Sequence, residues 1–173
     1  MMRTEAGEPV RLLDQNRALW DRLLIQRGLT ALRRAEASGG TPGLYVLQAA
    51  IAACHARAST PGETDWNRIA ALYETLAQTT ESPIVRLNQA VAISIAHGPQ
   101  AGLDLVDALA SDPALATYPY LPSARGDFLE RLGRLNEARA EFERAASLTK
   151  NSREKALLLA RAHTCAVATG NDV

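Results

Sequence analysis

The sequence predicts an all-α protein of about eight helices, and three observations point to that fold class. Ala, Leu, Arg and Glu, which are good helix formers, dominate the 173 residues, whereas aromatic residues make up only 5%. Apolar residues recur at the spacing of a helix face and do not alternate as they would in a strand. Proline follows Ser, Gly or Asp at several points, as it does where helices begin. No sheet is expected.

The first three helices are expected over residues 15–37, 42–58 and 65–79. Asp14 can cap the first helix, and Thr64 or Asp65 the third, because their side-chain oxygens accept bonds from the free N–H groups of a first turn. The second and third helices carry apolar stripes at helical spacing. These stripes consist of Leu44, Leu47, Ile51, Cys54 and Ala58, and of Trp66, Ile69, Ala70, Tyr73, Leu76 and Ala77.

Five further helices are expected over residues 83–97, 99–110, 119–132, 135–149 and 152–168. Pro83 and Pro99 open the fourth and fifth, since a proline at the first helical position loses no hydrogen bond. Gly133 separates the sixth from the seventh, and Asn151 with Glu154 resembles a capping box at the start of the eighth. The connecting loops are short, so consecutive helices should pack as antiparallel neighbours.

The charge and cysteine content exclude several classes of protein. Nineteen basic residues balance nineteen acidic residues, whereas a DNA-binding domain usually carries a basic excess. Cys54 and Cys165 are too few for a disulfide framework and fit a reducing compartment. No apolar run approaches the length of about 18 residues that a membrane helix needs. We therefore expect a cytoplasmic protein that binds neither nucleic acid directly nor a membrane.

Catalytic and metal-binding patterns are weak. Cys54 and His55 are adjacent, but neighbouring residues on a helix point about 100° apart and cannot face one substrate as a nucleophile and its base. No cluster of His, Cys, Asp or Glu has metal-ligand spacing, and no Gly-rich phosphate loop is present. The sequence predicts no enzyme, no metal and no cofactor.

Residues 122–150 resemble a tetratricopeptide (TPR) hairpin. Gly126 stands where the first helix of that motif needs a small residue, Gly133 opens the turn, and Lys150 stands where a proline is usual. The small, aromatic and small positions of the second helix are Ala138, Phe142 and Ala145. Segments 41–76 and 83–110 look like degenerate copies, with first helices roughly 40 residues apart. The resemblance implies a TPR-like superhelix of stacked antiparallel hairpins with a concave surface.

Six strings in a fixed order resemble the C-terminal extension of one group of extracytoplasmic-function (ECF) bacterial sigma factors. They are DQNRALWD (Asp14–Asp21), GLYVLQAAIAACHA (Gly43–Ala56), TDWNRIAALYETL (Thr64–Leu76), SPIVRLNQAVA (Ser82–Ala92), GPQAGL (Gly98–Leu103) and LPSARGDFLERLGR (Leu121–Arg134). In that group a TPR-like domain follows the two domains that bind DNA and polymerase. Asn16 and Gln89 depart from the usual strings.

The resemblance implies a regulatory, non-catalytic interaction domain that contacts the sigma core, RNA polymerase or a signalling partner. The two core sigma domains are not present, so we expect an excised domain or a truncated gene product. Within it, residues 1–13 should be poorly ordered and residues 14–169 should form a single TPR-like domain. Two alternatives stay open: a free-standing TPR adaptor that binds a peptide, and a small-molecule sensor with a polar concave pocket.

Two sets of polar residues are candidate contacts. Asp14, Arg17 and Asp21 begin the first helix, where Arg17 and Asp21 are four residues apart and can pair on one face. The resemblance makes this string the seam to the sigma core, and the alternative is a capped, solvated helix start. The concave-face candidates are Gln48, His55, Asn88 and Arg125.

Each concave-face candidate has an ordinary structural reading as well. Asn88 is expected on an apolar helix side, where its amide would bond to another helix or to a ligand. His55 would either make a structural hydrogen bond or face a ligand. By contrast, Glu141 belongs to a mixed-sign outer face that should be merely solvated.

Overall fold

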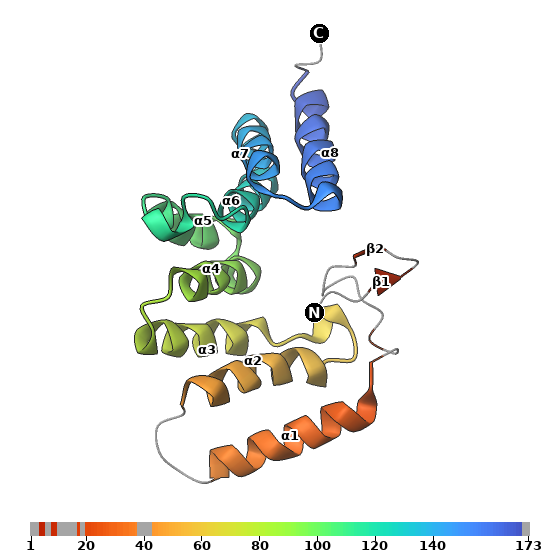
Figure 1. Cartoon of the computed structure of the whole chain (residues 1–173), viewed down its shortest axis with the longest axis vertical. Coiled ribbons are helices and arrows are strands. Elements are labelled where there is room, and N and C mark those ends of the chain that lie inside the picture. Colours follow the sequence, from red (N-terminus) through yellow and green to blue (C-terminus); the bar gives the residue numbers. More distant parts are fainter. Residues whose placement is uncertain (1–3, 6–7, 10–16, 18–19, 38–42, 171–173) are drawn as a thin grey trace. The chain divides into compact units, whose positions relative to one another are not determined.

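The computed structural model describes residues 4–5, 8–9, 17, 20–37 and 43–170. In this part of the chain eight α-helices follow one another along the sequence (Figure 1). They are α1 (Arg22–Ala37), α2 (Leu44–Arg57), α3 (Trp66–Thr79), α4 (Pro83–His97), α5 (Pro99–Leu109), α6 (Tyr120–Arg131), α7 (Leu135–Leu148) and α8 (Ser152–Ala168). The predicted all-α class and helix order are confirmed, and every helix except the first lies close to its expected bounds. Two 3₁₀ helices, η3 (Pro61–Glu63) and η4 (Pro113–Leu115), were not expected.

The first helix begins later than predicted. Asp21 is its cap, because its Oδ1 accepts a hydrogen bond from the Leu24 N–H at 3.0 Å. Arg17 lies ahead of the helix in a 3₁₀ conformation and is buried. Asp14, the predicted cap, lies outside the described residues.

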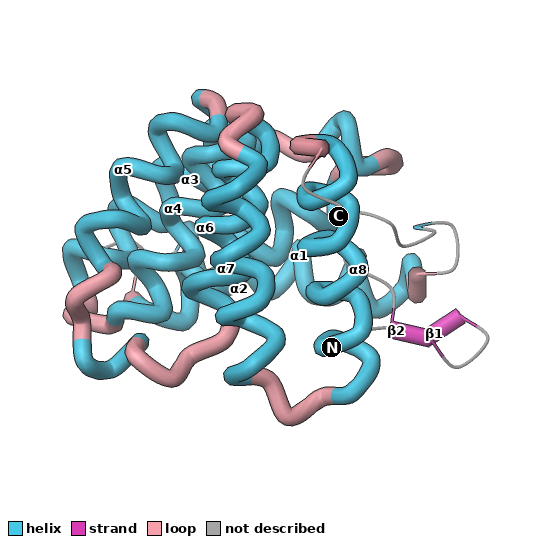
Figure 2. The backbone as a smooth tube through the Cα atoms, turned by 90° about the horizontal axis from the view of Figure 1, so that it is seen from above, coloured by secondary structure: helices cyan, strands magenta, loops and turns pink. Residues whose placement is uncertain are grey.

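The expectation that no sheet forms is wrong. Strands β1 (Thr4–Glu5) and β2 (Glu8–Pro9) pair antiparallel, with Thr4 opposite Pro9 and Glu5 opposite Glu8 (Figure 2). Strands of two residues are too short to leave a period-two pattern in the sequence, because the pairing depends on backbone groups alone. Most of residues 1–13, which were expected to be poorly ordered, lie outside the described residues.

The chain divides into two compact units, Met1–Leu76 and Ala77–Val173. In the first unit α1 packs on α2 through Leu32, Ala50 and Ala53, and three partly buried residues surround this cluster. They are Leu29, Val46 and Leu72. The single domain predicted over residues 14–169 stays a prediction.

The second unit has the larger core. Helix α4 packs on α5, α5 on α6, α6 on α7 and α7 on α8. Phe128 of α6 and Phe142 of α7 are almost fully buried at its centre. The remaining buried side chains are mainly Leu and Ala, whose different sizes allow the helices to interlock at close range.

The predicted hairpin glycines have the expected structural roles. A Cβ on Gly126 would lie 2.7 Å from Cε1 of Phe142, so α6 and α7 can approach closely only because residue 126 has no side chain. Gly133 adopts φ +76° in the turn between the two helices, a conformation that other L-residues rarely adopt. Ala138 and Ala145 flank Phe142 in the core, as the motif predicts.

Three helix starts have the side-chain caps that the sequence indicates. Asp65 accepts a bond from the Arg68 N–H at 2.9 Å, and Ser82 accepts one from Val85 at 3.4 Å. Asn151 caps α8, but Glu154 bonds to the Thr149 hydroxyl instead of completing the expected capping box. Within the described residues a capping box is present at η3, between Thr60 and Glu63. No helix in the described ranges is long and apolar enough to cross a membrane.

Candidate functional site

Arg17 lies at the centre of a buried polar cluster in the first unit. Arg17 lies a few residues before the start of α1, and only 5% of the residue is exposed. Nη1 donates to the carbonyl oxygens of His55 and Ala58, both at 3.0 Å, and Nη2 donates to Thr64 Oγ1 at 3.0 Å. The guanidinium carbon also lies 5.3 Å from the ring centroid of Trp20. One cation thus satisfies carbonyl groups at the end of α2, where the helix dipole is negative.

The expected pairing of Arg17 with Asp21 is not what the structure contains. Arg17 turns its guanidinium inward to α2, whereas Asp21 is exposed and uses its carboxylate to cap α1. A pairing of residues four apart requires both to lie in one α-helix. Helix α1 starts only at Arg22, after both Arg17 and Asp21. Arg17 therefore has a structural role within the first unit. Of the two charged residues, only Asp21 is exposed to solvent.

His55 borders the same cluster. Its ring meets Trp66 edge to face, with centroids 5.2 Å apart, and its Nδ1 is buried without a hydrogen-bond partner among the described residues. Burial, and then the nearby charge of Arg17, lower the pKa of His55 from its ordinary 6.5. The imidazole is consequently neutral at neutral pH. Burial also lowers the pKa of Arg17, and the carboxylate of Glu63 partly offsets this.

A polar depression of about 230 Å³ lies beside this cluster. It is lined by Cys54, Arg57, Ala58, Glu63, Asp65 and Arg68. Glu63 accepts bonds from two backbone N–H groups of its own turn, and Asp65 caps α3, so both carboxylates already have structural roles. Burial raises the pKa of the Cys54 thiol, which therefore stays protonated and is a poor nucleophile. Nowhere in the described ranges do three His, Cys, Asp or Glu residues cluster closely enough to hold a metal ion.

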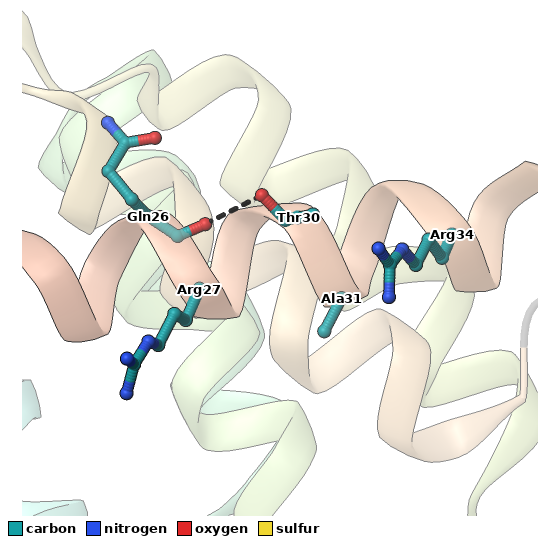
Figure 3. Close-up of a pocket in the computed structure, with 5 residues that line it drawn as sticks. All are labelled: Gln26, Arg27, Thr30, Ala31 and Arg34. Carbon is teal, nitrogen blue, oxygen red and sulfur yellow. Dashed lines mark hydrogen bonds between the residues drawn. The ribbon is translucent and has the colours of Figure 1, made fainter.

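The outer face of α1 carries a larger depression, of about 420 Å³. Its lining comes from one helix: Gln26, Arg27, Thr30, Ala31 and Arg34 (Figure 3). The Thr30 hydroxyl donates to the Gln26 carbonyl oxygen at 2.9 Å, and Arg33 donates to Thr30 Oγ1 at 3.1 Å. In Figure 3 Arg27 and Ala31 project from the same side of the helix. Arg27 and Arg34 place two cationic side chains at this depression.

Two of the predicted concave-face residues are exposed. Gln48 is exposed on α2 of the first unit, and Asn88 is exposed on α4 of the second unit. The expectation that Asn88 lies on the apolar side of its helix is wrong. Leu87 and Ala90 occupy the buried face, and a residue 100° further around the helix points outward. An exposed amide is hydrated and needs no protein partner.

Arg125 joins three helices of the second unit. Its Nε donates to Asp107 of α5 at 2.7 Å, and its Nη1 donates to Glu141 of α7 at 2.9 Å. Burial acts to lower the pKa of Arg125, but its hydrogen bonds and charge pairing with Asp107 and Glu141 outweigh burial and raise the pKa. Arg125 is thus a half-buried residue that connects helices of the second unit. The expectation that Glu141 is merely solvated is wrong, because only 14% of its side chain is exposed.

We expect Glu141→Lys to destabilise the second unit by roughly 2 kcal/mol, because it removes the partner of Arg125 and places a second cation beside it. The measurement is the thermal unfolding midpoint followed by circular dichroism. Glu143→Lys is the matched control, since Glu143 is on the same helix but makes an exposed pair with Arg139 at 2.9 Å. Equal midpoints for the two variants would contradict the structural role of Glu141.

A second set of contacts made by arginines was not expected from the sequence. Arg161 of α8 pairs with Asp127 at 2.8 Å and with Glu130, both on α6, and its guanidinium carbon is 4.3 Å from the Phe142 ring centroid. Arg131 of α6 donates to the Ser94 carbonyl oxygen of α4 at 3.0 Å. The sequence offers one indication that Arg161 is partly buried, because it is adjacent to Ala162 on the apolar stripe of α8. Its acidic partners are more than 30 residues away in the sequence, so no local pattern links them.

Comparisons with known proteins identify one informative relative. The chain is 44% identical over 152 residues to an uncharacterized protein from Rhizobium meliloti (strain 1021). The match includes 88% of this chain but 35% of that protein, so the chain spans about a third of its relative's length. No protein-family model matches the chain, and no solved structure matches it.

Proposed function

We propose that this chain is a regulatory, non-catalytic interaction domain of an ECF sigma factor. It would modulate transcription initiation through contacts with the sigma core domains, with RNA polymerase or with a signalling partner. The observation that carries the proposal is the set of six strings in fixed order between Asp14 and Arg134, which resemble the C-terminal extension of that group. The relative's greater length supports it, because a regulatory extension belongs to a longer protein.

The arrangement of the helices supports an interaction domain of TPR type. Antiparallel hairpins that bury their apolar faces on one another leave polar outer faces free for a partner. The close contact of Gly126 with Phe142 and the positive φ of Gly133 are those that a TPR hairpin needs. We therefore extend the proposal to a TPR-like superhelix.

The chemistry of the described side chains fits a binding role better than a catalytic one. Burial raises the pKa of both cysteine thiols, Cys54 and Cys165. The buried or half-buried arginines hold helices together, as Arg17, Arg125 and Arg161 do. The balanced net charge favours protein partners over direct contact with nucleic acid. The proposed location is the cytoplasm, where transcription takes place in bacteria.

The genomic DNA upstream of the codon for Met1 provides the first test. We expect an open reading frame in phase that encodes two sigma-like helical domains. A promoter and a ribosome-binding site directly before Met1 or Met2 would contradict the proposal and favour the free-standing peptide adaptor.

A biochemical test follows from the same reading frame. The full-length protein and a version that ends before residue 14 would be compared in a transcription assay with RNA polymerase. We expect the two proteins to differ several-fold in initiation at their own promoter. Equal initiation would contradict a regulatory role for this domain.

A further inference from the structure

We propose that the outer face of α1 is the docking site for an acidic, amphipathic α-helix of a partner protein. This inference deepens the proposed function, on which it rests, by naming the chemistry of the partner. The outer face is defined here as Leu23, Leu24, Arg27, Gly28, Ala31 and Arg34. Each of these residues is exposed.

Gly28 shows that this face is open and can be approached closely. Glycine in a helix interior lowers helix stability relative to alanine. A Cβ on Gly28 would have nothing within 4 Å, in contrast to Gly102 and Gly126, which lie against neighbouring helices. No internal contact requires Gly28 to lack a side chain. The missing side chain leaves room for a partner's backbone to approach α1 at this position.

The opposite side of α1 is already used for packing. Leu32 is buried against Ala50 and Ala53, and Leu29 packs on the same cluster. Arg27 and Arg34 lie on the other side and line the depression of about 420 Å³ together with Ala31. They are seven residues apart, which is two helical turns and about 10 Å along the axis. Acidic residues seven apart on a second helix would match this spacing.

The charge on α1 determines the sign of the partner. Helix α1 has four exposed arginines, Arg22, Arg27, Arg33 and Arg34, against one acidic residue in its sequence, Glu36. Asp21, the neighbouring acid, is bound to the Leu24 N–H and caps the helix. Arg27 and Arg34 are thus complementary to a negatively charged surface.

Two exposed leucines favour a protein helix over a simple anion. Leu23 is 60% exposed and lies one turn before Arg27, and Leu24, which is 62% exposed, lies about 100° further around the helix. An apolar contact beside paired charges is the pattern by which an amphipathic helix docks in a groove. A polyanion such as duplex DNA would match the arginines but would leave these leucines in water.

The test uses the whole chain and a synthetic helical peptide of about 20 residues as the probe. The peptide carries glutamates seven residues apart with leucines on the same face, and a second peptide has lysines in place of the glutamates. Fluorescence anisotropy measures binding.

We expect micromolar affinity for the acidic peptide and at least tenfold weaker binding by the double variant Arg27→Glu, Arg34→Glu. The matched control is Lys150→Glu with Lys155→Glu, which makes the same charge change on exposed residues and should bind as the original chain does.

Gly28→Leu separates docking from folding. The open space around Gly28 predicts an unchanged or higher melting temperature for this variant, together with at least fivefold weaker peptide binding. A lower melting temperature with unchanged binding would overturn the argument from Gly28.

Several results would overturn the proposal. They are equal binding of the acidic and basic peptides, equal loss of binding in the arginine and lysine variants, and preferential binding of duplex DNA or of phosphatidylserine vesicles. These results are independent of the reading frame upstream of Met1. If no sigma-like domains are encoded upstream, the proposed function is overturned but the peptide-binding result still holds. If the acidic peptide does not bind, the docking proposal is overturned but the assignment to a sigma factor is unaffected.

Discussion

Replacing Arg17 with methionine should lower the free energy of unfolding of the first unit by about 3 kcal/mol. Methionine keeps much of the apolar stem but removes every donor. The carbonyl oxygens of His55 and Ala58 and the Thr64 hydroxyl then lose their partner in a buried place. Arg17→Glu should be more damaging still, because a carboxylate would face these carbonyl oxygens and Glu63.

Tryptophan fluorescence during urea unfolding is the suitable measurement. The chain has two tryptophans, Trp20 and Trp66, and both lie in the first unit near Arg17 or His55. Arg27→Met is the matched control: Arg27 is exposed on α1, so the change should cost less than about 0.5 kcal/mol. Equal midpoints for Arg17→Met and Arg27→Met would show that the buried hydrogen bonds contribute nothing to stability.

Gly102→Ala should destabilise the second unit by about 3 kcal/mol, although alanine is the better helix former by about 1 kcal/mol. A Cβ on Gly102 would lie 2.5 Å from the Ser94 Cβ and 2.9 Å from the Ala90 carbonyl oxygen. The second of these atoms belongs to the backbone of α4, so no rotamer change removes the overlap. Helices α4 and α5 would have to move apart, which loosens the core around Phe128.

The matched control for Gly102→Ala is Gly28→Ala, which places the same methyl group in a helix where nothing lies within 4 Å. It should raise stability by up to about 1 kcal/mol. Thermal unfolding followed by circular dichroism compares the two variants, which should move the midpoint in opposite directions. A higher midpoint for Gly102→Ala would contradict the close approach of α4 and α5.

Local patterns account for the part of the fold that sequence analysis predicted well. The helix containing Ala138, Phe142 and Ala145 was recognised because its buried residues repeat every three or four positions and are close in sequence. Asp65 and Ser82 mark helix starts because each bonds to a backbone group two or three residues away. Gly133 was identified because a left-handed turn needs a glycine.

The candidate contact residues were predicted less well, because their environments depend on distant parts of the chain. Arg17 reaches groups 38 to 47 residues later, and nothing near it in the sequence indicates that its charge is buried. Arg125 and Glu141 look like ordinary surface charges until α5, α6 and α7 bring them together. Asn88 was expected among apolar residues, yet a small rotation of the helix decides which side of the stripe is buried.

Local sequence patterns specify the all-α class, the order and bounds of α2 to α8, and the glycine positions of the α6–α7 hairpin. These follow from hydrogen bonds and apolar repeats that act over a few residues. Which arginines are buried and structural, and which are exposed, depends instead on contacts that form when the chain folds. A guanidinium can bond to any carbonyl or carboxylate that folding brings within reach, so Arg17 became structural while Arg27 and Arg34 stayed exposed.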